Sequence, residues 1–265
     1  MTSGDVSVPI DTSVVQPARR YNYWLGGKDN FAADRLSGDG IELIYPHIRT
    51  SAVQNRMFLQ RVVRYLVEQA GIRQFLDVGT GLPTEGNTHE VAQEIAPQCR
   101  VVYVDNDPMV MVHARALLTS SREGKTAYIE ADLREPRAIL ADTTLTATLD
   151  LRQPVAVLLV AVVHFLPDDA EAVAAVKTLV DAMVPGSFLV VSHATGDLMG
   201  PASVQALADW GYVGKGDTTL RSKAWMSGLF DGLDLVDPGL QIVSDWRPPL
   251  GQDRVRHPCD CGVMT

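Results

Sequence analysis

Strand-like and helix-like segments alternate through the middle of the chain, and this alternation limits the fold more than any other feature. Seven segments have the apolar, β-branched composition of strands: residues 74–78, 101–104, 126–130, 155–163, 188–192, 241–246 and 261–264. Helical spacing of apolar residues separates the first five of them. Because strand–helix–strand units place successive strands in parallel, the pattern predicts an α/β fold with helices on both faces of a mostly parallel sheet.

The region before the first strand predicts a helical extension. Residues 1–15 are mostly small or polar, which favours a flexible arm. Residues 16–71 contain a capping box at Ser51 and Gln54 followed by helical spacing, so we expect a long helix to begin there. Residues 72–265 would form the core, and the absence of repeats or a long linker favours one domain over 16–265.

A glycine-bearing loop follows the first predicted strand in the run FLDVGTGLPT. Gly79 and Gly81 would let a nucleotide lie against bare backbone at the carboxyl edge of the sheet. Asp105 ends the next strand, at a spacing suited to accept hydrogen bonds from two ribose hydroxyls. A single Gly-x-Gly is also typical of a tight strand-to-helix turn without a ligand, so the loop alone does not decide between the two.

The same loop discriminates between nucleotide cofactors. A dinucleotide fingerprint needs a third glycine at the position of Thr84, and Glu85 beside a pyrophosphate would be repelled. A cationic sulfonium tolerates acidic neighbours, which favours S-adenosylmethionine over NAD. Asp132, after the third strand, is placed either to accept from an adenine amino group or to cap a short helix near Arg134.

The motifs DVGTG, YVDND and EADL resemble motifs I, II and III of class I S-adenosylmethionine-dependent methyltransferases. More narrowly, YNYWLGGKDNFAADR, NRMFLQRVVRYL, FLDVGTGLPT and DGLDLVDPGLQIVSDWRP resemble a bacterial family named S-adenosyl methyltransferase. The resemblance implies a doubly wound, seven-stranded Rossmann-like methyltransferase sheet with an antiparallel last strand. It also implies S-adenosyl-L-methionine as cofactor and S-adenosyl-L-homocysteine as product.

Matching of motifs also implies which residues contact the cofactor. Gly79 and Gly81 would face its methionine and ribose portions, and Asp105 its ribose hydroxyls. Leu133 would lie with Asp132 against the adenine. Together, the implied cofactor residues are Asp77, Gly79, Gly81, Asp105, Asn106, Asp107, Asp132, Leu133 and Ala161. The usual third glycine is replaced here by Leu82-Pro83, which leaves the path of the loop open.

Candidate catalytic residues lie at the ends of the fourth and fifth strands. Methyl transfer is an in-line displacement, so a base is needed only if the acceptor must lose a proton. His164 is the best-placed candidate and His193 the second, since imidazole titrates near neutral pH. The alternative for His164 is packing at the strand–helix corner or contact with the cofactor.

An unusual polar and aromatic cluster near the N-terminus is a possible lid over the cofactor. Aromatic faces attract cations such as a sulfonium, and a lysine could meet a carboxylate. The alternative is ordinary packing beside a solvated turn. The candidate lid residues are Tyr23, Lys28, Asp29, Asn30 and Arg56, with Tyr21 and Trp24 beside them.

Charge and motif spacing restrict the acceptor. A net charge of −9 and a pI near 5.1 argue against a nucleic-acid partner. The strand end AVVHFLPD also lacks the Asn/Asp-Pro-Pro-aromatic motif seen in enzymes that methylate exocyclic amines of nucleic acids. We therefore expect a small-molecule acceptor. His257, Cys259 and Cys261 are metal-ligand types, but with no second cluster we expect a plain strand and no metal.

The remaining sequence features concern location and alternatives. Three cysteines and an N-terminus unlike a secretory signal favour the cytoplasm. The longest apolar run is about half of what a membrane helix needs. The predicted function is methyl transfer from S-adenosylmethionine. The alternatives are a non-catalytic regulator that binds the cofactor or its product, and an NAD-dependent oxidoreductase. Monomer and homodimer both stay open.

Overall fold

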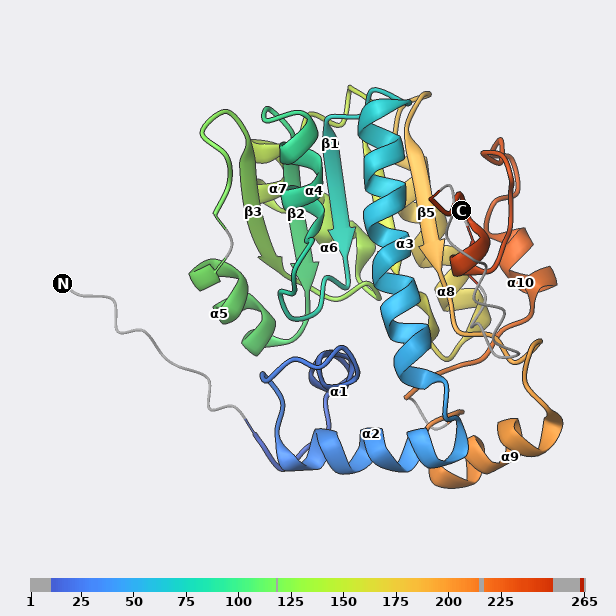
Figure 1. Ribbon diagram of the computed structural model, residues 1–265. Helices are drawn as coiled ribbons and strands as arrows, with labels where there is room; N and C mark the ends of the chain where they lie inside the picture. The colour runs from blue at the N-terminus through green and yellow to red at the C-terminus, as the bar shows by residue number, and fades with distance from the viewer. Residues whose placement is uncertain (1–10, 118, 215–216, 250–262, 265) are drawn as a thin grey trace.

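A six-stranded sheet forms the centre of the computed structural model, which describes residues 11–117, 119–214, 217–249 and 263–264 (Figure 1). Its strands are β1 (Gln74–Val78), β2 (Arg100–Asp105), β3 (Lys125–Glu130), β4 (Ala156–Val160), β5 (Phe188–Ser192) and β6 (Val263–Met264). Their order is β3-β2-β1-β4-β5-β6. The first five are parallel and β6 pairs antiparallel with β5. The predicted α/β class and mostly parallel sheet are confirmed.

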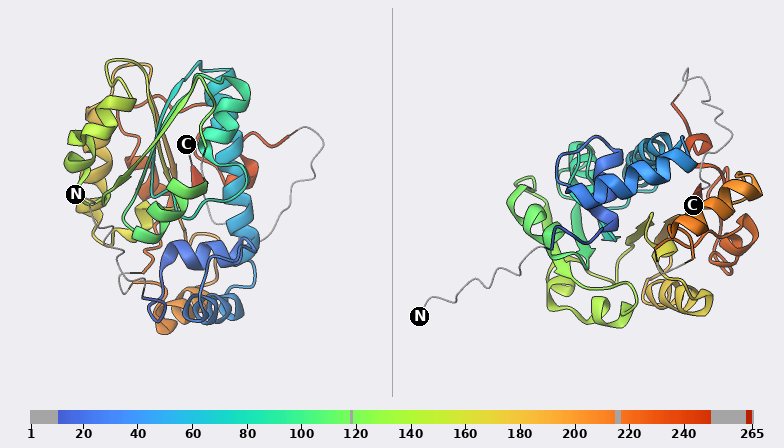
Figure 2. Two further views of the ribbon diagram at one scale, coloured as in Figure 1. Left: turned by 90° about the vertical axis from the view of Figure 1, so that its left-hand side faces the viewer. Right: turned by 90° about the horizontal axis from the view of Figure 1, so that it is seen from below.

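Helices cover both faces of this sheet, as the alternating pattern predicts (Figures 1 and 2). Successive strand residues such as Phe75 and Leu76 belong to two different hydrophobic clusters. One cluster includes α3 (Ile48–Glu68) and α4 (Thr88–Ile95). The other includes α6 (Pro136–Ala141), α7 (Thr143–Thr148), α8 (Asp169–Asp181) and α10 (Lys223–Gly228). At the β3 edge, α5 (Pro108–Leu117) contacts β2 and β3.

The strand predicted at residues 241–246 is wrong. The segment contains a 3₁₀ helix, η2 (Val243–Asp245), that contacts α3. Arg61 of α3 donates to the carbonyls of Val243 and Trp246, so these acceptors are satisfied by a side chain rather than by a neighbouring strand. The seventh strand of the expected sheet is therefore not formed there.

The fourth strand is shorter than predicted. β4 ends at Val160, and Ala161 turns the chain away from the sheet with φ of 57°. The 3₁₀ helix η1 (Val163–Phe165) follows. A positive φ is costly for a residue with a Cβ, and such backbone conformations concentrate at functional sites. The apolar run thus encodes a strand followed by a sharp turn.

Helix starts test the capping predictions. A capping box of Asn87 and Glu90 begins α4, and Asp168 caps α8. The predicted start at Ser51 is wrong, because α3 begins at Ile48 and continues through it. Ser51 is buried, and its Oγ lies 2.8 Å from the hydroxyl oxygen of Tyr45. Its hydroxyl thus takes part in a tertiary contact instead of a cap.

The N-terminal extension lies below the carboxyl ends of the strands (Figure 1). It is helical, as predicted, and contains α1 (Pro17–Trp24) and α2 (Ala32–Ile44), which contacts α1 and α9 (Pro201–Trp210). The buried Asp34 carboxylate accepts from the backbone of Gln16 and Phe31 and forms an ion pair with Arg19. This network fixes α1 against α2. Residues 1–10 of the predicted arm lie outside the described residues.

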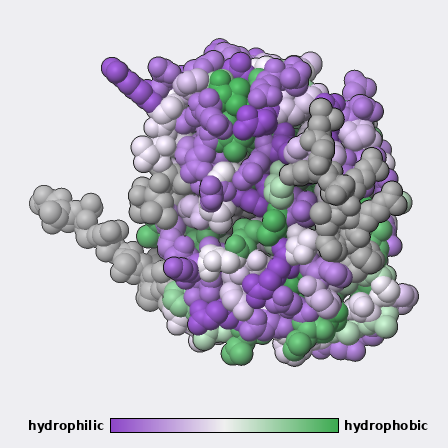
Figure 3. Space-filling model, viewed as in Figure 1, coloured by the Kyte–Doolittle hydropathy of each residue, from purple (hydrophilic) through white to green (hydrophobic). Residues whose placement is uncertain are grey.

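The face of the molecule seen in Figure 3 is mostly hydrophilic, with small and separate hydrophobic areas. Within the described ranges, no helix combines the length and the apolar composition needed to cross a membrane.

Candidate functional site

A cavity of about 380 Å³ lies where the carboxyl ends of the strands meet α1 and α3. It opens between β1 and β4, where the strand order reverses: the chain runs outward from β1 to β3 on one side and through β4 and β5 on the other. In doubly wound sheets this switch point is where ligands bind. The volume is within the range of small-molecule sites, which is roughly 300–1,000 Å³.

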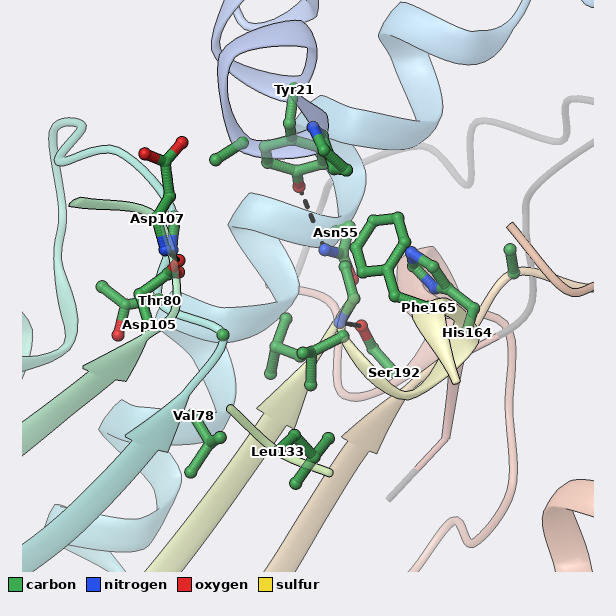
Figure 4. Close-up of a pocket in the computed structure, with 18 of the residues that line it drawn as sticks. Tyr21, Asn55, Val78, Thr80, Asp105, Asp107, Leu133, His164, Phe165 and Ser192 are labelled. Atoms are coloured by element: carbon green, nitrogen blue, oxygen red, sulfur yellow. Dashed lines mark hydrogen bonds between the residues drawn. The ribbon is translucent and has the colours of Figure 1, made fainter. Parts of the chain in front are cut away.

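The strand order arranges the predicted residues across this cavity. Asp132 follows β3, Asp105 ends β2, and Gly79 and Gly81 follow β1, so the acidic groups lie on one side. His164 follows β4 on the opposite side (Figure 4). All nine residues implied as cofactor contacts line the cavity: Asp77, Gly79, Gly81, Asp105, Asn106, Asp107, Asp132, Leu133 and Ala161.

The two loop glycines are needed for different reasons. Both have positive φ, 76° at Gly79 and 67° at Gly81. A Cβ at Gly79 would lie 2.3 Å from a methyl carbon of Val162, so this glycine permits contact with the turn after β4. A Cβ at Gly81 would meet nothing within 4 Å. Open space beside Gly81 leaves its backbone accessible to a ligand.

Asp105 is held by the backbone around it. Its carboxylate accepts from the amides of Gly81 and Asp107, at 2.8 and 3.0 Å. Burial raises the pKa of Asp105 to about 6, and these two hydrogen bonds limit the rise. The side chain is therefore a pre-oriented carboxylate beside the glycine loop, ionised at neutral pH.

Asp77 and Arg56 meet near the start of the loop. Burial raises the pKa of Asp77 to about 6, although a hydrogen bond from the Thr88 hydroxyl and the nearby Arg56 charge oppose the rise. Arg56 donates to Asn87, and Asn87 also accepts from the Thr84 amide. These bonds define the path of the loop after Leu82-Pro83. Arg56 Nε is buried without a partner among the described residues.

Asp132 is the most strongly stabilised carboxylate of the cavity. Its two oxygens accept from the Arg134 guanidinium, the Arg134 amide and Asn106. The Arg134 hydrogen bonds lower the pKa of Asp132 to about 2. The alternative role as a helix cap is wrong, because α6 begins at Pro136 and its N-cap is Glu135.

His164 is a buried, neutral imidazole. Burial lowers its pKa well below the usual value, and the neighbouring His193, Arg20 and Arg221 lower it further. Its ring centroid lies 4.3 Å from that of Phe165, and its Nδ1 has no hydrogen-bond partner among the described residues. A group with so low a pKa is a weak base at neutral pH.

His193 has no unoccupied ring nitrogen. Its Nε2 lies 3.1 Å from a guanidinium nitrogen of Arg221, which can only donate, so Nδ1 carries the proton and donates to the carbonyl of Ala194. Burial lowers the pKa of His193 to about 4. The second catalytic candidate is therefore a neutral hydrogen-bonded side chain with no lone pair available for an acceptor's proton.

The predicted lid divides into two groups. Tyr21, Trp24 and Arg56 line the cavity, whereas Tyr23, Lys28, Asp29 and Asn30 do not. The second group includes a loop held by Asn22, whose side-chain oxygen accepts from the Asp29 amide and from Asn30 Nδ2. Tyr23 donates to Asp39 of α2.

Comparison with known proteins identifies the chain. A family model described as S-adenosyl methyltransferase matches residues 3–264. The chain belongs to this family. It is accordingly an S-adenosylmethionine-dependent methyltransferase with that compound as its cofactor, as the sequence motifs predict. No curated protein matches the chain.

Two solved structures resemble this S-adenosyl methyltransferase over nearly its whole length. A DUF574 family protein from Streptomyces avermitilis is 40% identical, with a TM-score of 0.89 and 96% of each chain covered. A candidate methyltransferase from Thermobifida fusca is 39% identical, with a TM-score of 0.87, covering 96% of this chain and 94% of that one.

The cavity suits the cofactor of the family on its own geometry. The accessible backbone at Gly81 and the carboxylates of Asp105 and Asp132 lie on one side. Two further polar atoms of lining residues, Asp107 Oδ2 and Arg56 Nε, are buried without a partner among the described residues. Buried polar atoms normally have partners, so unpaired ones beside a cavity indicate a ligand or water.

Three lining residues of this methyltransferase escaped the sequence analysis. Arg20 is buried, forms a two-bond pair with Asp217 and lies over the rings of Trp24 and Tyr212. Asn55 donates to the Tyr21 hydroxyl. Tyr212 comes from the segment after α9. Arg20 and Asn55 directly precede two residues that the sequence analysis named, Tyr21 and Arg56. Nothing in the sequence points to Tyr212.

The three candidate metal-ligand residues near the C-terminus, His257, Cys259 and Cys261, lie outside the described residues.

Arg221 is a buried clamp on the turn after β4. Its guanidinium donates to the carbonyls of Val163 and Leu166 and to Asp169. We expect Arg221→Met to lower the free energy of unfolding by about 2–3 kcal/mol, because the buried Leu166 carbonyl loses its Arg221 donor and the Val163 carbonyl keeps only the Leu166 amide. Urea denaturation measures this change.

Arg152 provides the matched control for Arg221. Its guanidinium also pairs with a nearby carboxylate, that of Asp150, but its side chain is 90% exposed, so Arg152→Met should change stability by less than about 0.5 kcal/mol. Equal losses in the two variants would contradict the role of Arg221 as a clamp.

Proposed function

We propose that this enzyme methylates a small molecule bound between α1 and the ends of β4 and β5. The observation that carries the proposal is the division of one cavity into an acidic half at the ends of β1, β2 and β3 and a half without carboxylates after β4 and β5. The first half suits the adenosyl group. The second is covered by α1 and α3, which favours a small acceptor over a macromolecule.

We assign the cofactor contacts by position. Asp105 would accept from the ribose hydroxyls, because its carboxylate is fixed beside Gly81. Asp132 would contact the adenine amino group through an acceptor lone pair left by Arg134 and Asn106. Asp77 would lie near the cofactor's ammonium group, where its negative charge stabilises the cation.

Bound S-adenosylmethionine supplies an electrophilic methyl group on a sulfonium. The residues of this chain would contribute orientation and exclusion of water, which can account for most of the acceleration in an in-line displacement. Tyr21 and Trp24 cover the cavity, while Ala161 fixes the turn that leads to His164. His164 would contact the acceptor through its ring.

The affinity for cofactor should depend on pH. Asp77 and Asp105 both have a pKa of about 6, raised by burial. Above pH 6 they are ionised and attract the cationic cofactor, and below it they are neutral. We expect the affinity for S-adenosylmethionine to fall by about tenfold or more from pH 7.5 to pH 5, as measured by calorimetry. A flat profile would contradict these assignments.

Turnover separates the enzyme from a regulator that only binds the cofactor. The full chain is incubated with S-adenosylmethionine and a library of small metabolites, and S-adenosylhomocysteine is measured by mass spectrometry. Product above the level without acceptor supports the proposal. Tight binding of cofactor with no turnover on any acceptor would favour the regulator.

The acidic net charge argues against a nucleic-acid substrate, and the few cysteines support a cytoplasmic location.

A further inference from the structure

The half of the cavity opposite the acidic groups has its own chemical character. We call it the acceptor half and define it by Arg20, Tyr21, Trp24, Asn55, His164, Phe165 and Tyr212. Figure 4 shows Tyr21, Asn55, Phe165 and His164 together, away from Asp105 and Asp107. Four of its seven residues are aromatic, so a planar ring would find both apolar area and edge or face contacts.

Three polar atoms of the acceptor half lack partners among the described residues. They are Arg20 Nε, Asn55 Oδ1 and His164 Nδ1, and all are buried. The orientation of Asn55 follows from its contacts: the Tyr21 hydroxyl donates to the Ala52 carbonyl, so it must accept from Asn55 Nδ2. The half thus offers one guanidinium donor, one amide acceptor and one imidazole nitrogen.

The charged side chains that line or lie directly behind the acceptor half are arginines, and no carboxylate of a described residue lines it. Among the described residues that line the cavity, every Asp lies at or after the end of β1, β2 or β3, and no Glu is present. Arg20 faces this half, and Arg221 lies behind His193. Their carboxylate partners, Asp217 and Asp169, do not line the cavity.

The positive charges that act on the histidines would act in the same way on a ligand in the acceptor half. Arg20, Arg221 and His193 disfavour a second proton on His164, in addition to the effect of burial. A cationic amine in this half would meet the same repulsion with no carboxylate to offset it. An oxyanion would be attracted and could accept from Arg20 Nε–H.

We infer that the acceptor is a planar aromatic hydroxyl compound that reacts as its oxyanion, and that the acceptor half excludes cationic amines. This inference rests on the proposed function. The hydroxyl proton leaves to solvent before the reaction. The oxyanion then forms the new O–CH₃ bond while the methyl–sulfur bond breaks, and the electron pair of that bond stays on sulfur. Ionisation of the acceptor itself, rather than a protein base, would control the rate.

Binding of 4-nitrophenol tests the inference without turnover, because the nitrophenolate anion is coloured. The full chain is saturated with S-adenosylhomocysteine at pH 6, where the free compound is mostly neutral. We expect the phenolate fraction of bound 4-nitrophenol to be several times that of the free compound, with its apparent pKa lowered by about one unit, and benzylamine to bind at least tenfold more weakly. Neutral bound phenol, no binding of 4-nitrophenol, or tighter binding of benzylamine would each overturn the inference.

Two variants that each add one carboxylate test whether the effect on 4-nitrophenol binding arises in the acceptor half. Asn55→Asp adds a carboxylate to the acceptor half and should weaken 4-nitrophenol binding at least tenfold while S-adenosylhomocysteine affinity is retained. Gln54→Glu adds the same charge one residue away, outside the cavity lining, and should change neither affinity. Equal effects of the two variants would overturn the inference. If S-adenosylhomocysteine does not bind the unaltered chain, the proposed cofactor assignment fails; if it binds and only the acceptor results differ, the inference alone fails.

Discussion

Asp105→Asn should weaken binding of S-adenosylhomocysteine by about 10- to 100-fold, the largest effect on ligand affinity expected for one substitution in the cavity. The carboxylate is buried and oriented by the amides of Gly81 and Asp107, so its remaining lone pairs are fixed for the ribose hydroxyls. Loss of charge-assisted hydrogen bonds costs about 1–3 kcal/mol. Calorimetric titration at pH 7.5 measures the affinity directly.

The same substitution should stabilise the protein without ligand. The folded pKa of Asp105, about 6, exceeds the ordinary aspartate value of 3.8, so the folded state is penalised at pH 7 for keeping the carboxylate ionised. Replacing it with a neutral amide removes this penalty but leaves either the Gly81 or the Asp107 amide facing Nδ2 instead of an acceptor, so the free energy of unfolding should rise by less than about 2 kcal/mol at pH 7. The gain should shrink as the pH falls below 6, where Asp105 becomes protonated in the unaltered protein.

A helix cap outside the cavity lining is a control for the general effect of replacing a carboxylate with an amide. Asp142 also accepts from a backbone amide, that of Thr144, at the start of α7. Asp142→Asn should leave S-adenosylhomocysteine affinity unchanged. An unaltered affinity in folded Asp105→Asn protein would show that the ribose lies elsewhere, whereas weaker binding together with a lower unfolding free energy would indicate a general structural role.

The sequence predicts the sheet well where the signal is local. β1 and β5 have the predicted bounds, because each is a short apolar run between a turn and a polar residue. The caps at Asn87 and Asp168 were also readable, since each needs only residues within one helical turn. The segment 241–246 has the same apolar composition, yet Arg61, distant in sequence, supplies the hydrogen bonds that a strand would need. Composition cannot reveal that distant donor.

The candidate site likewise has one part that the sequence predicts and one part that it does not. Strand-end residues such as Gly81 and Asp105 were predictable, because parallel strands bring their carboxyl ends to one edge. The acceptor half is assembled from α1, α3, η1 and the segment after α9, so Arg20 and Tyr212 meet only in the folded chain. The run of Lys28, Asp29 and Asn30 stood out in the sequence, but it does not line the cavity. It forms a loop whose Asp29 amide and Asn30 side chain donate to Asn22.

Gly79→Ala should cause the largest loss of stability of any single methyl group added to the loop. Two penalties act together at this position. The φ of 76° lies in the left-handed region, which costs a residue with a Cβ about 1–2 kcal/mol. The new Cβ would also fall 2.3 and 2.5 Å from two carbons of Val162, and overpacking of this kind costs about 1–3 kcal/mol. We expect a total loss of about 2–5 kcal/mol by urea denaturation.

Gly81→Ala separates the two penalties, because its φ is similarly positive but its Cβ would meet open space. It should lose only the conformational part, about 1–2 kcal/mol. Adding Val162→Ala to Gly79→Ala should recover part of the collision cost, and the coupling between the two sites in a double-mutant cycle gives its size. Equal losses at Gly79 and Gly81 with no coupling to Val162 would mean that the loop shifts away from the turn after β4 and that their close contact does not determine the shape of the cavity.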